Sequence, residues 1–172
     1  MEMMPVWALS LSYWVHMVVT VIWLGGLVTV AFFILPLIQN NINSEQKDKI
    51  LTTIQKKLNP LGWLCLFILT GTGMFQMSEH PSYQGFLSID NNWALAIFIK
   101  HVVIVFMVLA MGYMTWFVIP GLNKISLKQK LGKEIDQNEM LKLRKREKSI
   151  IWVNTILALL VLIFTAWARS VS

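Results

Sequence analysis

Four long apolar stretches alternate with polar segments along the chain. They cover residues 7–38, 61–77, 93–119 and 150–168. A helix needs roughly 20 mainly apolar residues to cross ~30 Å of hydrocarbon, and the second stretch is shorter but uncharged. The strict alternation of a β-barrel strand is absent. The pattern predicts an all-α integral membrane protein, an antiparallel up-down four-helix bundle that forms a single four-span domain over residues 1–172.

Two of the polar segments also carry helical signals. In the segment 39–59, apolar residues recur at helical spacing, which predicts a partly helical segment; they are Ile50, Leu51, Ile54 and Leu58. In the segment 123–149, Asp136 is followed three residues later by Glu139, a spacing typical of a helix N-cap. We therefore expect the fourth span to extend beyond the membrane towards Asp136.

Composition agrees with a membrane protein. Hydrophobic residues make up 56% of the chain and charged residues 14%, against ~45–50% and ~25% in soluble domains. Mean hydropathy is +0.59. These values exclude an ordinary soluble domain and a disordered chain. The single cysteine, Cys65, has no partner for a disulfide within the chain.

The basic residues are concentrated in two of the polar segments. Residues 39–59 hold four and residues 123–149 hold nine, which is thirteen of the fifteen Lys and Arg residues, while residues 78–92 hold none. Short basic loops remain on the cytoplasmic side, so we expect both termini outside. Topology and anionic lipid headgroups account for the net charge of +6. The expected partners are therefore membrane lipids and no nucleic acid, and the expected location is the bacterial inner (cytoplasmic) membrane, with multiple passes.

Three ionisable residues lie inside the predicted spans: His16, Lys100 and His101. Such residues are costly in a bilayer and by default indicate function. Counted from Trp7 and Trp93 at 1.5 Å per residue, His16 lies ~13 Å and His101 ~12 Å below the outer surface. Two histidines on different helices thus lie at matching depth in the outer half of the membrane.

Paired histidines at one depth are typical of a haem b site. A ring nitrogen of each imidazole can bind haem iron, and b-type haem needs no cysteine attachment. Spans one and three are diagonal in an up-down bundle, which leaves space for a macrocycle. The sequence therefore predicts haem b with His16 and His101 as iron ligands; Met77 remains an alternative second ligand. Hydrogen bonding of each histidine to a Ser or Thr of a neighbouring helix is the structural alternative.

Further residues fit the same site. Trp23 and Gly26 lie at helical spacing from His16 and are candidate cofactor contacts. Thr70 and Gly73 lie on the second span at about the depth of the histidines, where glycines leave room for a flat ring or allow close backbone approach. Lys100 faces ~100° away from His101. It is a candidate counter-charge for a haem propionate or another anionic substrate, or else it extends its ammonium to the membrane surface.

A second set of residues suggests copper. Met74, Met77 and His80 are spaced by three at the outer end of the second span, and thioethers with imidazole suit copper. Methionine is also a general filler of apolar cores. Copper is therefore the alternative cofactor.

Several stretches resemble the CopD copper-resistance superfamily of four-helix membrane proteins. The stretch from His16 to Gly26, with Trp23-Leu24-Gly25-Gly26 seven residues after the histidine, resembles that family's first helix, and Leu69-Thr70-Gly71 resembles its second. The related HemJ-type protoporphyrinogen oxidases are similar in the first-span His, the third-span lysine and an Asn matched by Asn154. Where those oxidases carry an aromatic-Leu-Pro-Arg stretch, this chain has Leu27-Val28-Thr29. The resemblance implies either copper handling or haem b with oxidation of protoporphyrinogen IX.

Three functions follow from these observations. The favoured one is a membrane haem-b protein that transfers electrons near the outer face, alone or as a subunit of a larger redox complex, because two imidazole ligands give a six-coordinate iron. The alternatives are a HemJ-type oxidoreductase and a CopD-like copper transport or resistance protein. The inner half lacks histidines that would continue a copper path, and its one cysteine, Cys65, stands alone.

Overall fold

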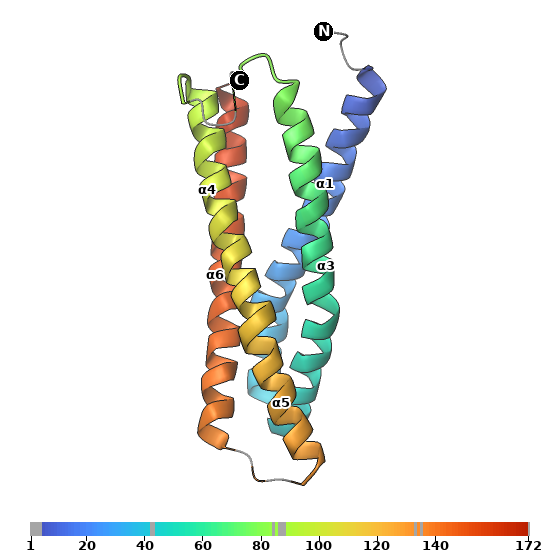
Figure 1. Cartoon of the computed structure of the whole chain (residues 1–172), viewed down its shortest axis with the longest axis vertical. Helices are drawn as coiled ribbons and strands as arrows, with labels where there is room; N and C mark the ends of the chain where they lie inside the picture. Colours follow the sequence, from blue (N-terminus) through green and yellow to red (C-terminus); the bar gives the residue numbers. More distant parts are fainter. Residues whose placement is uncertain are drawn as a thin grey trace.

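The chain is an all-α four-helix bundle, as its sequence predicts. The computed structural model describes residues 5–41, 44–83, 85, 89–132, 134 and 136–171, and these form helices without a strand. Four continuous rods result (Figure 1). Their elements are α1 (Val6–Val28), η1 (Thr29–Ile34) and α2 (Leu35–Asn41); α3 (Ser44–Ser78); α4 (Asn92–Tyr113), η2 (Met114–Val118) and α5 (Ile119–Lys130); and α6 (Gln137–Ser170).

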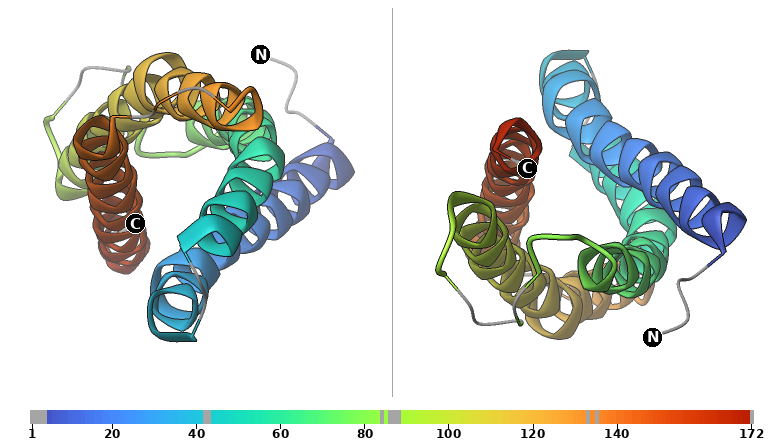
Figure 2. Two further views of the ribbon diagram at one scale, coloured as in Figure 1. Left: turned by 90° about the horizontal axis from the view of Figure 1, so that it is seen from below. Right: turned by 90° about the horizontal axis from the view of Figure 1, so that it is seen from above.

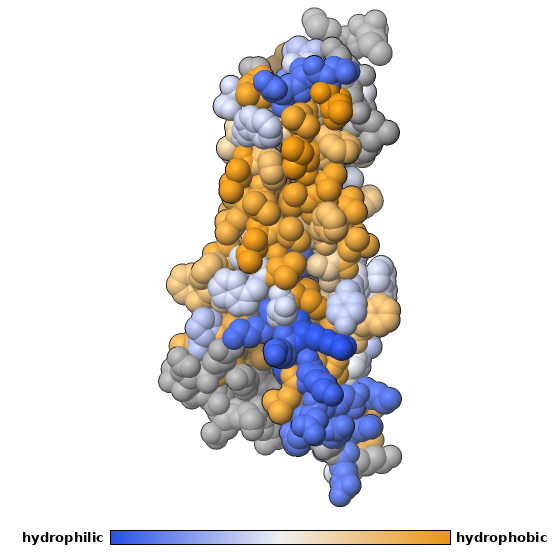
Figure 3. Space-filling view, turned by 90° about the vertical axis from the view of Figure 1, so that its left-hand side faces the viewer, coloured by the Kyte–Doolittle hydropathy of each residue, from blue (hydrophilic) through white to orange (hydrophobic). Residues whose placement is uncertain are grey.

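All four rods are long and apolar enough to cross a membrane. Large apolar side chains point outwards, among them Trp14, Phe67 and Phe117, of which Phe67 is 79% exposed. On the face of the molecule shown in Figure 3, hydrophobic residues form a broad band over the middle, with hydrophilic residues above and below it. The chain is therefore a multi-pass membrane protein whose lipid-facing surface is apolar.

The rods run antiparallel, so both termini lie at one end and the basic segments at the other (Figure 1). Among the basic residues, Lys133 and the side chains of Lys47 and Lys130 lie outside the described residues. We refer to the two ends as the terminal end and the basic end.

The helices associate as two pairs. α4 packs extensively against α6, and α1 against α3, while contacts between the pairs are fewer and include α1 with α6 and α3 with α5. The pairs diverge towards the terminal end (Figure 1), and the end views show them lying beside each other (Figure 2). His16 belongs to one pair and His101 to the other.

Two rods contain a π-helical segment just before a proline. η1 ends two residues before Pro36, and η2 ends two residues before Pro120. A proline lacks the N–H and clashes with the carbonyl four residues earlier, which here lies inside the π segment. The wider π turn accommodates this defect. Both rods therefore continue through their prolines, a feature that hydrophobic periodicity did not predict.

Both expected helical extensions are present, and the one before the second span is longer than predicted. α3 begins at Ser44 and passes through Pro60 to Ser78, so the basic segment before the second span is continuous with it. The Asp136 side chain caps α6, accepting hydrogen bonds from the backbone N–H groups of Asn138 (2.8 Å) and Glu139 (3.2 Å). Both basic segments are thus largely helical.

Candidate functional site

The His16 imidazole is held in one orientation between α1 and α3. Its Nδ1 lies 2.7 Å from Thr72 Oγ1. The Thr72 hydroxyl donates to the carbonyl of Ile68 at 2.7 Å, so towards His16 it acts as acceptor. Nδ1 therefore carries the proton, and the lone pair of the neutral ring lies on Nε2.

Gly73 makes room for this ring. A Cβ atom on Gly73 would lie 3.4 Å from His16 Cε1, a tight contact. The sequence suggested that glycines here leave space for a cofactor or for close backbone approach; the space at Gly73 is taken by the imidazole itself.

One turn nearer the terminal end, the Gln76 side chain donates to the carbonyl of Ser12 at 3.0 Å. The α1–α3 contact in this half is thus a polar interface.

The His101 imidazole is oriented by its own helix. Its Nδ1 lies 2.7 Å from the carbonyl oxygen of Ile97. A carbonyl only accepts, so Nδ1 carries the proton and Nε2 the lone pair in the neutral ring. By helical spacing His101 shares a face of its rod with Thr115. That face turns towards α3, because Thr115 Oγ1 accepts from Trp63 Nε1 at 3.0 Å.

Lys100 links the two histidines electrostatically. Its ammonium group acts on the imidazoles of both His16 and His101. Lys100 also falls on one side of α4 with Met107, seven residues on, which is fully buried. The structure therefore brings the three predicted ionisable residues into one region of the bundle, with members from both helix pairs.

The other predicted contacts divide between two places. Trp23 and Gly26 line a cavity of about 80 Å³ between all four rods, farther from the terminal end than His16. Thr70 lies one turn before Gly73 but donates to the carbonyl of Leu66 in its own helix at 2.8 Å. Trp23 and Gly26 thus belong to the central cavity, and Thr70 is engaged by the α3 backbone.

The residues of the copper alternative have separate roles. Met74 is half exposed, whereas Met77 is buried in a cluster with Trp93 and Ala168. His80 stacks on Trp93 with ring centroids 4.1 Å apart, and its Nδ1 accepts from the backbone N–H of Ser82 at 3.2 Å. That bond puts the proton of the neutral ring on Nε2, so neither nitrogen offers a lone pair to copper.

The pKa of His80 is also lowered. Burial and the nearby Arg169 charge lower the pKa of its imidazole below the ordinary value. Across the described part of the chain, no group of three or more His, Cys, Asp or Glu side chains is placed to bind a metal ion. The arrangement of His80 favours a packing role at the terminal end.

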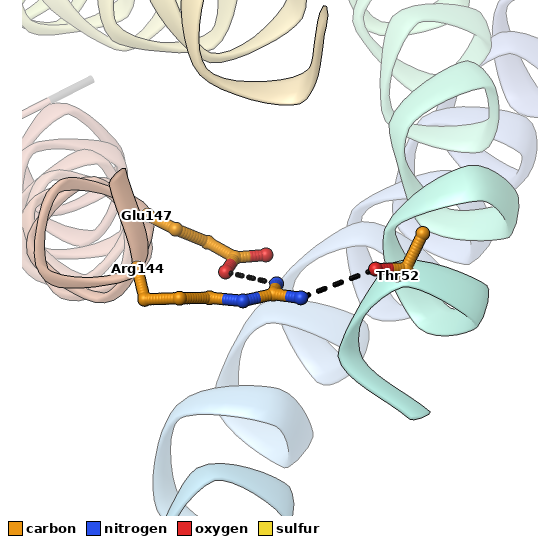
Figure 4. Close-up of polar contacts among 3 residues, drawn as sticks. All are labelled: Thr52, Arg144 and Glu147. Carbon is orange, nitrogen blue, oxygen red and sulfur yellow. Dashed lines mark hydrogen bonds and ion pairs between the residues drawn. The ribbon is translucent and has the colours of Figure 1, made fainter. Parts of the chain in front are cut away.

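Sequence reasoning missed a polar network at the basic end. Arg144 Nη1 lies 2.7 Å from Glu147 Oε2, and Arg144 Nη2 donates to Thr52 Oγ1 at 3.2 Å, which joins α6 to α3 (Figure 4). The Glu147 side chain is only 2% exposed. A mixed-charge run such as residues 144–148 is normally a solvated helix surface, and only the rotation of α6 reveals that Glu147 faces inwards.

Sequence reasoning also missed Thr72 and the amide side chains of the central cavity. Gln55, Asn59 and Asn154 line that cavity. Asn154 is 6% exposed, and its Oδ1 has no hydrogen-bond partner among the described residues. Amides within apolar helices were the available signal, and only Asn154 was singled out, through the resemblance.

Comparisons of the chain with models of known protein families, with curated proteins and with solved structures found no match.

Proposed function

We propose that this chain is a membrane haem-b protein that transfers electrons near the outer face of the bacterial cytoplasmic membrane, alone or within a larger redox complex. One observation carries the proposal. Two imidazoles from opposite helix pairs each have Nδ1–H fixed by an oxygen acceptor, Thr72 Oγ1 for His16 and Ile97 O for His101. Histidines that bind a metal are typically oriented in this way, by an oxygen acceptor at the ring nitrogen that does not bind the metal.

The donor set fits haem b. His16 and His101 would hold the iron through Nε2, and bound haem b would supply a one-electron Fe(III)/Fe(II) couple. With two imidazole ligands, the bound group would suit electron transfer. The chain's own part is to fix both rings before the cofactor arrives, so little conformational freedom is lost on binding.

Lys100 supports the same proposal. A cation that acts on both imidazoles inside an apolar bundle is costly unless an anion accompanies it. Haem b carries two propionates, and Lys100 would pair with one of them. The basic end supports the orientation, since positive loops stay cytoplasmic and place the histidines in the outer half.

The test is the optical spectrum of the detergent-purified full chain, oxidised and dithionite-reduced, with a pyridine haemochrome assay. About one haem b per chain with sharp reduced bands is expected. His16→Ala and His101→Ala should each abolish the low-spin spectrum. His80→Ala, which removes an imidazole from the terminal end, is the matched control and should leave the spectrum unchanged.

Each outcome decides between the functions. Haem that survives His101→Ala would place the second ligand elsewhere and favour the protoporphyrinogen oxidase alternative, which the resemblance to HemJ-type enzymes suggests. Absence of haem from protein made in haem-supplied cells would overturn the proposal. Copper handling, as in the CopD superfamily, would then be tested by metal analysis of the same sample.

A further inference from the structure

The central cavity has walls from all four rods and a partly polar lining. Its apolar wall includes Trp23, Met111 and Met114, and its polar wall comes from Gln55, Asn59 and Asn154. A volume of about 80 Å³ holds several water molecules, since one needs roughly 10–15 Å³. A space of this size is too small for a tetrapyrrole or a lipid headgroup.

Asn154 indicates what occupies this space. Its side chain is 6% exposed and its Oδ1 has no hydrogen-bond partner among the described residues. A buried acceptor without a donor costs roughly 1–3 kcal/mol. The occupant must therefore donate a hydrogen bond. No carboxylate stands among the lining residues, and methionine sulfur is a poor ligand for hard cations, so a metal cation is disfavoured.

The polar wall continues towards the basic end. On α3, Thr52, Gln55 and Asn59 recur at spacings of three and four, which places them along one face. Asn59 Oδ1 accepts from Thr115 Oγ1 at 2.9 Å, so this face is also the one that meets the third rod. About one helical turn before Gln55, Thr52 accepts a hydrogen bond from Arg144 beside the buried Glu147 (Figure 4).

We propose that the cavity between Gln55, Asn59 and Asn154 is a water-binding site, holding a cluster of water molecules in the middle of the bundle. Water donates to Asn154 Oδ1 and accepts from amide N–H groups, which satisfies both kinds of polar atom. The site is distinct from the histidine region and does not depend on haem.

Neighbouring glycines provide a matched pair of variants. No atom lies within 4 Å of a Cβ added to Gly26 or to Gly25. Gly26 lines the cavity, whereas Gly25 is exposed on the lipid-facing side. Gly26→Leu therefore fills the cavity and displaces the water, while Gly25→Leu adds the same side chain outside it.

The test is X-ray hydroxyl-radical footprinting of the full chain in nanodiscs, read by mass spectrometry at three methionines. Radicals form from water next to the modified side chain. Met111 and Met114 are 7% and 5% exposed and line the cavity, whereas Met107, one turn from Met111, is fully buried and does not line it. We expect Met111 and Met114 to be oxidised at least ~5-fold faster than Met107, because only a side chain in contact with buried water meets the radical formed from that water.

Gly26→Leu and Asn154→Leu should reduce both rates to that of Met107, and Gly25→Leu should not. A melting temperature and circular dichroism spectrum like those of the parent chain show that each variant folds, and two independent variants guard against misfolding of one. Equal rates at the three methionines in the parent chain would overturn the proposal. Protection of Met111 and Met114 by an organic molecule detected in native mass spectra would overturn it as well.

Discussion

His16 Nδ1 and Thr72 Oγ1 lie 2.7 Å apart and join α1 to α3 inside the apolar part of the bundle. Thr72 is itself anchored, because its hydroxyl donates to the backbone carbonyl of Ile68. The imidazole is thus attached to a second helix through a side chain that cannot easily rotate. Such a partner fixes the tautomer of the His16 ring and directs its Nε2 away from the Thr72 hydroxyl.

Thr72→Val keeps the shape of the side chain and removes this acceptor. If His16 binds haem iron, loss of its orienting partner should weaken haem binding by about 10–100-fold. The rate of haem transfer to excess apomyoglobin measures the effect. Thr72→Ser retains the hydroxyl and should behave as the parent chain. Equal transfer rates for Val and Ser at this position would contradict the assignment.

Gly73→Val introduces bulk where the ring now lies. A Cβ there is already 3.4 Å from His16 Cε1, so the larger side chain must displace the imidazole. We expect loss of the low-spin haem spectrum, while the helix itself survives because Val is a better helix former than Gly. Gly71→Val is the control, since no atom lies within 4 Å of its added Cβ. A spectrum unchanged in Gly73→Val and lost in Gly71→Val would reverse this interpretation.

Lys100→Met removes a positive charge that acts on both histidines. A nearby cation stabilises the reduced, less positive iron centre, so its removal should lower the reduction potential. The expected shift is on the order of 60 mV, equivalent to tenfold for a one-electron couple. Lys100→Arg keeps the charge and should shift the potential much less. Potentiometric titration of the parent chain and the two variants measures the reduction potential. A higher potential in Lys100→Met than in the parent chain would contradict the assigned position of the charge.

Hydropathy was enough to predict the four helices and their antiparallel order, because the requirement for about 20 apolar residues per span is strict. Spacing also predicted the Asp136 cap, which depends only on local backbone geometry. The start of α3 was not predicted, because a proline such as Pro60 usually marks a helix boundary and here lies within the helix.

The candidate site was only partly predictable. The charge of Lys100 and the rings of His16 and His101 stand out because ionisable groups are rare in membranes. Thr72 does not stand out from Thr70 two residues earlier; which of them meets His16 depends on the rotation of α3 against α1. The burial of Glu147 could not be predicted for the same reason, since the rotation of α6 decides whether this carboxylate faces inwards or faces solvent.

The His80–Trp93 stack makes the terminal end sensitive to acid. Burial and Arg169 hold the pKa of His80 in the folded protein below its unfolded value of about 6.5. The unfolded chain therefore binds the proton first, so this contribution to stability is complete above pH ~6.5 and declines as the pH falls below it. The melting temperature should drop less between pH 7.5 and 5.5 in His80→Phe, which keeps an aromatic ring, than in the parent chain. Identical drops would show that His80 does not contribute.

Arg144→Met tests how the buried Glu147 carboxylate is tolerated. The substitution removes the guanidinium that lies 2.7 Å from Glu147 Oε2 and bridges to Thr52. Removing one partner of a buried ion pair costs about 3 kcal/mol or more, which corresponds to a fall of ~6–12 °C in melting temperature for a chain of this size. The double variant Arg144→Met with Glu147→Leu should recover most of the loss, because it removes the charge as well. Thr52→Val removes only the neutral acceptor and should cost about 1 kcal/mol. If the double variant were no more stable than Arg144→Met alone, the network would act through packing and not through the compensation of a buried charge.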